Sequence, residues 1–429
     1  MLPSRGAPAL ASCAWLFDLL FSSPAGVAWA ADGQLPAGYR QAERFAVLRP
    51  GTDRSFAVSL AARPGTASAL TSYNALRLAR RRPARRMLGI ALRTGLAQPR
   101  LRTKVAVGVA ADAADPDGGL AGLLTEHLSG LLGTGRVVLA FGGPSGPYRK
   151  PVLQVFGTDG TPLGYVKVGW NDWTRAAVSR EAAALRAAAA APMRLGVPAL
   201  LHQSSWQGLD LIVTAPLPRR VHGVGVGAAL PDVAILREIS ELSPAWTGPL
   251  AASPWWSGLR ERIAAGAAEP DARERLTLVS EAIEQAGGDA VLRFGTWHGD
   301  LVPWNLARHR GRLYAWDWED SAPAAPVGFD ALHFYFQTAF VWRRAGVAAA
   351  AALAARAAGP AIRALGQPPR AAELLATLHL LELAVRHEEA RASTGDHDRR
   401  FYPDALALLE QAAEPSPARP GLPFAGRSA

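Results

Sequence analysis

Three polar residues with catalytic chemistry, His298, Asp300 and Asn305, are spaced through an otherwise apolar stretch, WHGDLVPWNL (297–306). A second polar group follows in RLYAWDWEDS, where Asp317 stands between two tryptophans. The apolar neighbours predict that both segments are partly buried. A buried carboxylate is costly unless it binds a cation or a charged partner. The two segments therefore predict a site that holds one or the other.

The spacing of these residues is that of the H-x-D-x-x-x-x-N catalytic loop of kinases. Phosphoryl transfer needs a carboxylate within hydrogen-bond reach of the acceptor hydroxyl. It also needs an oxygen ligand for the magnesium ion that bridges the phosphates. Five residues around a tight loop let Asp300 face the acceptor and Asn305 face the metal. A β-hairpin is expected over 306–318, and its second strand carries Asp317 toward the same metal.

This arrangement resembles the aminoglycoside phosphotransferase/choline kinase-like family, over residues 131–395. The resemblance implies a protein kinase-like fold and gives each motif residue a role. Asp300 would be the catalytic base and His298 would shape its loop. Asn305 and Asp317 would bind Mg²⁺. Asp330, in PVGFDALHF, matches a later family element loosely, and a structural role is expected for it.

The chain departs from the family pattern beside the base. Val302 and Trp304 fall where the family often has His-Pro-Gly, so these positions affect the acceptor and the loop shape rather than the metal ligands. An aromatic face can stack on a ring-bearing acceptor. Trp304 is therefore the expected substrate contact, whereas Trp255 and Trp256 are expected in a core between helices.

The residues expected to bind ATP lie upstream of the loop. Lys167 occupies the third-strand position of the family's phosphate-binding lysine, and Glu181 on the next helix is placed to pair with it. Almost every other basic residue of the chain is Arg. The planar guanidinium of Arg would not replace a lysine well in a tight phosphate site, which supports this role for Lys167. The rest of the expected nucleotide site is Gly143, Ser145 and Gly146 in the loop GGPSGPYRK, and Thr214 and Ala215 in the hinge segment TAPLP.

Strand and helix patterns predict the elements that carry these residues. Strand-like runs at 136–143, 151–157 and 163–170 precede a helix at 174–191 and a strand in 209–218. The fold class is α+β, a bilobal protein kinase-like fold with a small β-rich N-lobe and a larger helical C-lobe. The predicted boundaries are an extra mixed α/β region at 1–130, the N-lobe at 131–216, the C-lobe at 217–413 and a disordered tail at 414–429.

Composition sets the broad class. A length of 429 residues, 49% of them hydrophobic, suits two or three compact units. The net charge is +10, yet only three basic residues are lysine, which together with the Ala, Gly and Pro content indicates a GC-rich genome. Most of the positive charge, including the run from Arg77 to Arg86, is therefore expected on a solvated surface.

The cellular setting is predicted from cysteine usage and apolar runs. Cys13 is the single cysteine, which excludes an internal disulfide framework and fits a reducing, cytoplasmic compartment. No uninterrupted apolar run reaches transmembrane length. The N-terminal stretch ends in an Ala-Trp-Ala that imitates a signal-peptidase site, but Asp18 interrupts its apolar centre and only Arg5 precedes it as a cation.

The motifs favour an ATP- and Mg²⁺-dependent phosphotransferase acting on a small-molecule hydroxyl, such as an aminoglycoside, choline or a sugar. One alternative is a kinase-fold regulator that binds nucleotide with little catalysis, because the glycine loop lacks a full G-x-G-x-x-G. A second is a nucleic-acid-binding protein that uses the arginine-rich N-terminal region, although that region has no recognisable reading module. Neither nucleic acid nor a membrane is an expected partner.

Overall fold

The computed structural model describes residues 10, 12–23, 26–31, 33–48, 55–72, 87, 89–91, 93–94, 104–111, 122–142, 149–266, 270–394 and 400–414. The arginine run at 77–86, the loop residues Gly143, Ser145 and Gly146, and the tail after Glu414 lie outside these residues. The chain divides into two compact units, residues 1–178 with 198–217 and residues 179–197 with 218–429. The expected α+β class, β-rich toward the N-terminus and helical toward the C-terminus, is confirmed.

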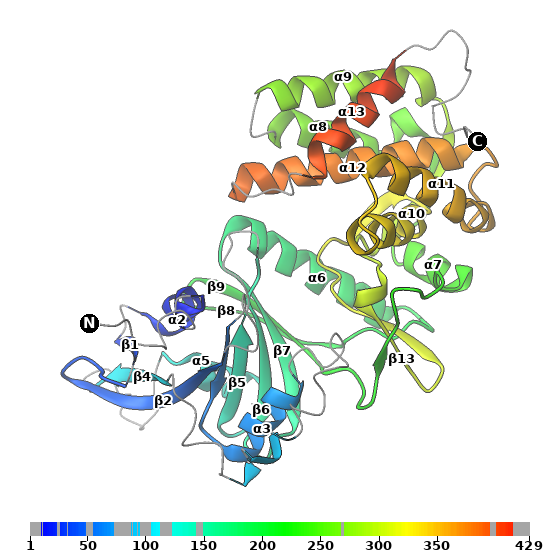
Figure 1. Cartoon of the computed structure of the whole chain (residues 1–429). Coiled ribbons are helices and arrows are strands. Elements are labelled where there is room, and N and C mark those ends of the chain that lie inside the picture. The colour runs from blue at the N-terminus through cyan, green and yellow to red at the C-terminus, as the bar shows by residue number, and fades with distance from the viewer. Residues whose placement is uncertain are drawn as a thin grey trace. The chain divides into compact units, whose positions relative to one another are not determined.

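The first unit is built on one antiparallel sheet of nine strands (Figure 1). The strand order is β1-β4-β2-β3-β5-β6-β7-β9-β8. The bounds are β1 Val27–Ala31, β2 Tyr39–Leu48, β3 Phe56–Ser59, β4 Lys104–Ala110, β5 Val137–Gly142, β6 Val152–Gly157, β7 Pro162–Gly169, β8 Leu200–Trp206 and β9 Leu209–Thr214.

Both faces of this sheet are covered by helices. Helices α2 (Ala14–Phe21) and α5 (Leu124–Leu131) pack on one face, and α3 (Arg63–Ser72) packs on the other. Side chains alternate between the faces along β5, so that Val137 and Leu139 join α2 and α5 while Val138 joins α3. The apolar N-terminal stretch that imitates a signal peptide therefore forms, in its described part, helix α2 and strand β1, and both contribute to the core of this unit.

Residues before 130 extend the same sheet as the predicted N-lobe. Strand β3 pairs directly with β5, with Phe56 opposite Gly142 and Val58 opposite Ala140. The described part of this region contains strands β1 to β4 together with helices α2 and α3. The boundary at 130/131 remains a proposal, and across it the backbone hydrogen bonding of the sheet is continuous.

The order of elements after the third N-lobe strand differs from the expectation. Helix α6 (Asp172–Ala190) is followed by two strands, β8 and β9, where the sequence predicted one. Strand β8 carries polar residues at an edge of the sheet, and its burial alternates between exposed and half-buried. The missing apolar face explains why its sequence, LLHQSSW, did not indicate a strand.

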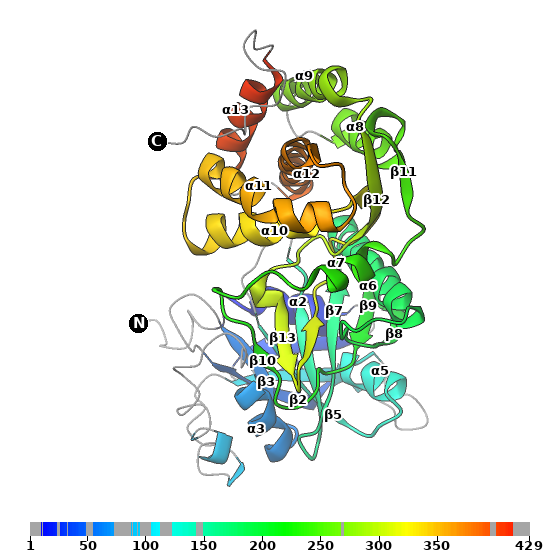
Figure 2. The ribbon, with the colours of Figure 1, turned by 90° about the vertical axis from the view of Figure 1, so that its right-hand side faces the viewer.

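The second unit is mainly helical, with two three-stranded sheets, β10-β13-β14 and β11-β12-β15. Figure 2 views α12 end-on, with α8, α9, α11 and α13 around it, and most of its Leu and Ala side chains are buried. The bounds are β10 His222–Gly223, α7 Val233–Ser240, β11 Trp246–Pro249, η3 Leu250–Ala252, α8 Pro254–Gly266, α9 Pro270–Gly287, β12 Val291–Trp297, η4 Pro303–Asn305, β13 Leu306–His309, β14 Arg312–Ala315, β15 Ala322–Pro326, α10 Phe329–Gln337, η5 Thr338–Trp342, α11 Val347–Ala364, α12 Ala371–Thr394 and α13 Tyr402–Ala413.

The tryptophans expected in a helical core are there. Trp256 is fully buried and Trp255 nearly so. The Trp255 ring meets Phe329 edge-on at 5.4 Å between centroids, the geometry that aromatic pairs prefer. No helix in the described part of the chain is both long and apolar enough to cross a membrane.

Candidate active site

The His298–Asn305 loop leaves the central strand of a sheet and enters a hairpin. Strand β12 lies between β11 and β15 and ends at Trp297, one residue before His298. Asn305 closes the short helix η4, and β13 begins at the next residue. The loop is therefore held at both ends by backbone hydrogen bonds of regular structure.

Asp330 fixes the backbone at the start of the loop. Its buried carboxylate accepts hydrogen bonds from the backbone N–H groups of His298, at 2.9 Å, and Gly299, at 3.2 Å. Burial raises the pKa of Asp330 to about 6, against the opposing effect of these two hydrogen bonds. The positioning contact of Asp330 agrees with the structural role expected for it.

Gly299 is required by the shape of the loop. Its φ of +85° lies in the left-handed region. A Cβ at this position would collide with the backbone carbonyl of Asp320. The glycine of the motif therefore lets two backbone segments approach more closely than any side chain would permit.

His298 is neutral and buried beneath the loop. Burial lowers its pKa to about 4, although the nearby carboxylates of Asp300 and Asp317 act in the opposite direction. Its ring lies against Trp318 at 4.3 Å between centroids, and its Nδ1 accepts the backbone N–H of Asp300 at 3.3 Å. His298 thus shapes the turn that presents Asp300. Its Nε2 has no hydrogen-bond partner among the described residues.

Asp300 is held from two sides and is one-third exposed. Asn305 donates from Nδ2 to Oδ2 of Asp300 at 2.7 Å. His333 on α10 lies with Nε2 3.2 Å from Oδ1. Both carboxylate oxygens therefore have a fixed partner, and the side chain remains partly open to solvent.

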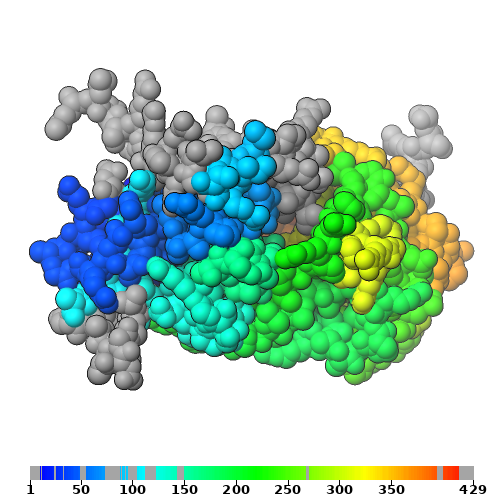
Figure 3. Space-filling model, turned by 90° about the horizontal axis from the view of Figure 1, so that it is seen from below, coloured from blue at the N-terminus to red at the C-terminus, as the bar shows by residue number. Residues whose placement is uncertain are grey.

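The hairpin brings Asp317 back to Asn305. Leu306 pairs with Ala315 in the β13–β14 register, and the backbone N–H of Trp316 donates to the carbonyl of Asn305 at 3.3 Å. Asp317 follows immediately, with a φ of +64°, a strained backbone that aspartate tolerates better than most residues. At the other end of the hairpin Arg310 is exposed, and Figure 3 shows this hairpin in yellow at the molecular surface.

The donor set of Asn305 and Asp317 fits a magnesium ion. Asn305 uses Nδ2 on Asp300, so its amide oxygen would remain for a hard cation, and the Asp317 carboxylate would be the second oxygen ligand. No group of three or more His, Cys, Asp or Glu residues in the described ranges is placed to hold a metal. Two protein ligands suit Mg²⁺, which usually keeps water and phosphate oxygens in its remaining positions.

Arg386 on α12 connects the loop with the segment after Asp317. Its guanidinium lies 4.2 Å from the centre of the Trp297 ring and donates to the carbonyls of Asp320, at 3.0 Å, and Gly299, at 3.4 Å. It also pairs with Glu382 at 2.7 Å. The carboxylate of Asp320 lies 4.0 Å from Arg386, so the arginine is also a partner of this acid.

Several contacts of the loop were not expected from the sequence. His333, His379 and Arg386 come from α10 and α12, far along the chain. His333 does carry a signal, because it stands three residues after Asp330 and so shares its helix face. His379 is one of three polar residues, with Thr377 and Glu382, in the mostly apolar run LATLHLLELAV, which by itself indicates only a buried histidine.

The expected nucleotide residues are divided between the two units. In the first unit Lys167 lies on β7, opposite Val152 and Ile212 of the neighbouring strands, and is 6% exposed. Lysine is rarely buried so deeply without a partner, which sets Lys167 apart from an ordinary strand-surface residue. Thr214 is the last residue of β9. The backbone N–H of Ala215 donates to the carbonyl of Ala199, so this N–H is not available to the adenine of a nucleotide.

Glu181, on the part of α6 that belongs to the second unit, is 2% exposed. Its pairing with Lys167 remains a prediction. Its neighbour Arg180 donates to the backbone carbonyl of Glu319 at 2.9 Å, which ties α6 to the segment after Asp317.

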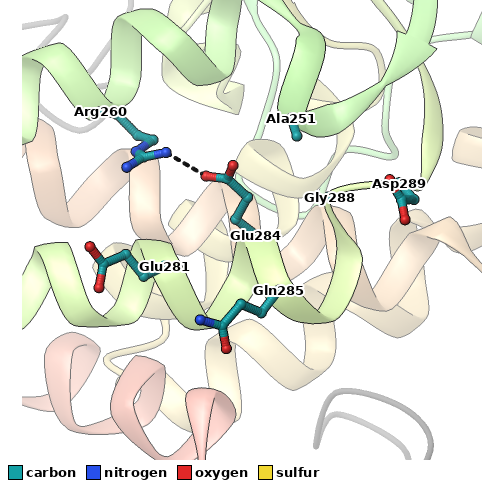
Figure 4. A pocket seen from close by; sticks show the side chains of 7 residues that line it. All are labelled: Ala251, Arg260, Glu281, Glu284, Gln285, Gly288 and Asp289. Atoms are coloured by element: carbon teal, nitrogen blue, oxygen red, sulfur yellow. Dashed lines mark hydrogen bonds and ion pairs between the residues drawn. The ribbon is translucent and has the colours of Figure 1, made fainter.

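A separate hollow of about 420 Å³ opens on α8 and α9 (Figure 4). It is lined by Ala251, Arg260, Glu281, Glu284, Gln285, Gly288 and Asp289. Arg260 and Glu284 point toward one another across it and form an ion pair of 2.7 Å. None of these residues belongs to the loop or to the hairpin, so the hollow supplies ordinary surface carboxylates that serve as controls.

Comparison with known proteins gives structural similarities only. No family model matches the sequence, and no curated protein matches it. The structure is similar to a thermostable mutant of an aminoglycoside phosphotransferase in ternary complex with ADP and hygromycin B, with 13% identity, a TM-score of 0.44 and coverage of 67% of this chain and 96% of that one.

Two further similar structures are kinases of other small molecules. One is a putative fructosamine-3-kinase from Haemophilus somnus, with 9% identity, a TM-score of 0.41 and coverage of 67% of this chain and 96% of that one. The other is a choline kinase from Streptococcus pneumoniae, with 12% identity, a TM-score of 0.39 and coverage of 61% of this chain and 89% of that one. These three structures are thus of small-molecule kinases, at low identity to this chain.

Proposed function

We propose that this chain is a phosphotransferase that uses ATP and Mg²⁺ to phosphorylate a hydroxyl group of a small molecule. The observation that carries the proposal is the arrangement around Asp300. A partly exposed carboxylate is fixed on both oxygens, one of them by Asn305, and the hairpin returns the backbone just before Asp317 to Asn305. A kinase needs this combination of a positioned base and a site for the metal–phosphate complex.

Asp300 acts as the base in this proposal. It accepts the proton of the acceptor hydroxyl while the hydroxyl oxygen forms a bond to the γ-phosphorus and the bond from that phosphorus to the ADP oxygen breaks. Positioning and charge stabilisation carry most of such a reaction. Asp330, His298 and Gly299 contribute by holding the loop backbone that carries Asp300.

The nucleotide is expected to use Lys167 for its phosphates, with Glu181 as the partner of the lysine. Asn305 and Asp317 would hold a magnesium ion, which would supply positive charge to neutralise the phosphates. Thr214 and Ala215 remain the expected hinge, although the N–H of Ala215 already donates to Ala199. A cytoplasmic setting, expected from the single cysteine, is part of the same proposal.

The test is a metabolite-library screen for magnesium-dependent ADP release by the purified full-length chain. Wild-type protein should release ADP with one acceptor class, and Asp300→Ala should reduce turnover by roughly 10³-fold or more, because the base is lost. Asp289→Ala is the matched control, since it removes an exposed aspartate from the hollow on α9. Nucleotide binding with no turnover toward any acceptor, in wild type and Asp300→Ala alike, would instead identify a non-catalytic nucleotide-binding protein.

The acceptor is expected to contact Trp304. This side chain is half-buried within η4, between the base and the metal ligand. Trp304→Ala should raise KM for the acceptor several-fold, because it removes one stacking contact, and it should leave KM for ATP unchanged. Equal changes in both KM values would show that Trp304 only supports the loop.

A further inference from the structure

Behind Asp300 two histidines form a line of hydrogen bonds into the core of the second unit. Nε2 of His333 lies 3.2 Å from Oδ1 of Asp300, and Nδ1 of His333 lies 3.3 Å from Nε2 of His379. His333, on α10, is 3% exposed, and His379, on α12, is 2% exposed. Both rings are buried away from solvent, and the hydrogen bond of His333 to Asp300 is their direct connection to the candidate base.

The direction of each hydrogen bond follows from the chemistry of the groups. An ionised carboxylate only accepts, so Nε2 of His333 must carry a proton and donate it to Asp300. A neutral imidazole has one donor nitrogen and one acceptor, so Nδ1 of His333 then accepts from Nε2–H of His379. This assignment satisfies all three groups without a positive charge on either ring.

The surroundings of His379 favour the neutral form. The rings of Trp297, Phe329 and Phe336 stand around it, with centroids 6.4, 5.6 and 5.9 Å away. Burial lowers the pKa of His379 well below its ordinary value, and the charge of Arg386 acts in the same direction. His379 therefore serves as a fixed neutral donor to His333.

We propose that His333 is a positioning residue for Asp300, and that His379 holds it in the Nε2–H tautomer. This inference rests on the proposed function of Asp300. With His333 on Oδ1 and Asn305 on Oδ2, the carboxylate cannot rotate about its side-chain bonds without breaking a hydrogen bond. The base is therefore oriented before the acceptor arrives, and its orientation is set from α10 and α12 as well as from its own loop.

The first test needs no substrate. In full-length protein labelled with ¹⁵N-histidine, His333 should show a protonated Nε2 and an unprotonated Nδ1, with its signals identified by their loss in His333→Gln. His379→Leu should shift both signals of His333, because the donor to Nδ1 is gone. His387→Gln, eight residues further along α12, is the matched control and should leave them unchanged. A His333 with a protonated Nδ1 would overturn the proposal.

The second test separates positioning from simple stability. His333→Phe should lower kcat roughly 10- to 100-fold with KM for ATP unchanged, because the base is present but misoriented. His333→Gln should recover most of kcat, since its amide nitrogen can replace Nε2–H. If His333→Gln folds and is as impaired as His333→Phe, the positioning role is overturned.

The two proposals fail in different ways. Active wild-type protein whose His333 has the opposite tautomer overturns the hydrogen-bond chain and spares the phosphotransferase. Wild-type protein that transfers no phosphate, yet shows the expected tautomer, overturns the proposed function and with it the positioning role.

Discussion

Each unit of the molecule buries a carboxyl group whose pKa burial has raised. In the second unit this is Asp330, with a pKa of about 6, and in the first it is Glu43 on β2, with a pKa of about 7. Asp330 accepts backbone N–H groups on both of its oxygens. Glu43 accepts from Thr125 on one oxygen, and its other oxygen has no hydrogen-bond partner among the described residues.

The difference shows that a buried acid can either stabilise the structure around it or destabilise it. A buried polar group contributes when it is fully hydrogen-bonded and costs free energy when it is not. The N–H groups that satisfy Asp330 belong to the loop that carries Asp300, so its burial fixes the candidate active site. Glu43 directly follows an irregularity in the β2–β4 register, and its carboxyl group does not hold a loop backbone in the way that Asp330 does. Substitutions at these acids and at the residues around them test this contrast.

The largest effect is expected for Gly299→Ala. The new Cβ would meet the backbone of Asp320, and the residue would keep a left-handed φ. We expect a loss of roughly 3 kcal/mol or more in the free energy of unfolding, measured by urea denaturation, and loss of phosphotransfer. Gly133→Ala in the first unit is the control, because its φ is +58° and a Cβ there would meet nothing within 4 Å. It should cost only about 1 kcal/mol, and equal losses for the two variants would contradict the crowding at Gly299.

Removing the supporting acid should come next. Asp330→Ala leaves the N–H groups of His298 and Gly299 without an acceptor in a buried site. We expect a loss of about 2–4 kcal/mol in unfolding free energy and a fall in turnover of roughly 100-fold. Denaturation and ADP-release assays on the same preparation measure both. A variant that is destabilised but turns over normally would separate Asp330 from the geometry of Asp300.

Removing the unsatisfied acid, Glu43, should raise the unfolding free energy rather than lower it. Because the folded state holds the proton of Glu43 to a higher pH than the unfolded chain does, this group makes stability fall as pH rises from about 4.5 to about 7. Glu43→Gln should abolish that part of the fall and raise unfolding free energy at pH 8 by about 1–3 kcal/mol. Denaturation midpoints across this pH range measure it. A variant less stable than wild type at pH 8 would show that the ionised carboxylate has a stabilising partner.

The smallest effect is expected from the arginines that accompany the two acids. Arg386 and Arg136 both lower the pKa of the acid in their own unit. Arg386→Lys should cost about 1 kcal/mol, because the planar fork reaches Gly299, Asp320 and Glu382 at once. Arg136→Lys should lower the unfolding free energy by less than half of that amount. The Arg136 guanidinium is exposed, and its one hydrogen bond within the described residues is to the carbonyl of Ala42. Thermal melts of the pair decide whether the contrast extends to these partners.

What the sequence determined was local. His298, Asp300 and Asn305 lie within eight residues, and the hairpin register that returns Asp317 to Asn305 depends on a short turn at Arg310 and Gly311. Such geometry is set by neighbouring residues, so their types and spacing were enough to predict the cluster. The α+β class followed from strand and helix periodicity for the same reason.

What only the tertiary structure decided was pairing between distant segments. The contact of His333 and His379 joins α10 to α12, and the pairing of β3 with β5 carries one sheet from the N-terminal region into the predicted N-lobe. Partners so far apart in the chain are selected by which apolar faces are buried together and by which buried polar groups then need hydrogen bonds. No local pattern records that choice, so a histidine in an apolar helix became a candidate support for the base only when the structure placed it there.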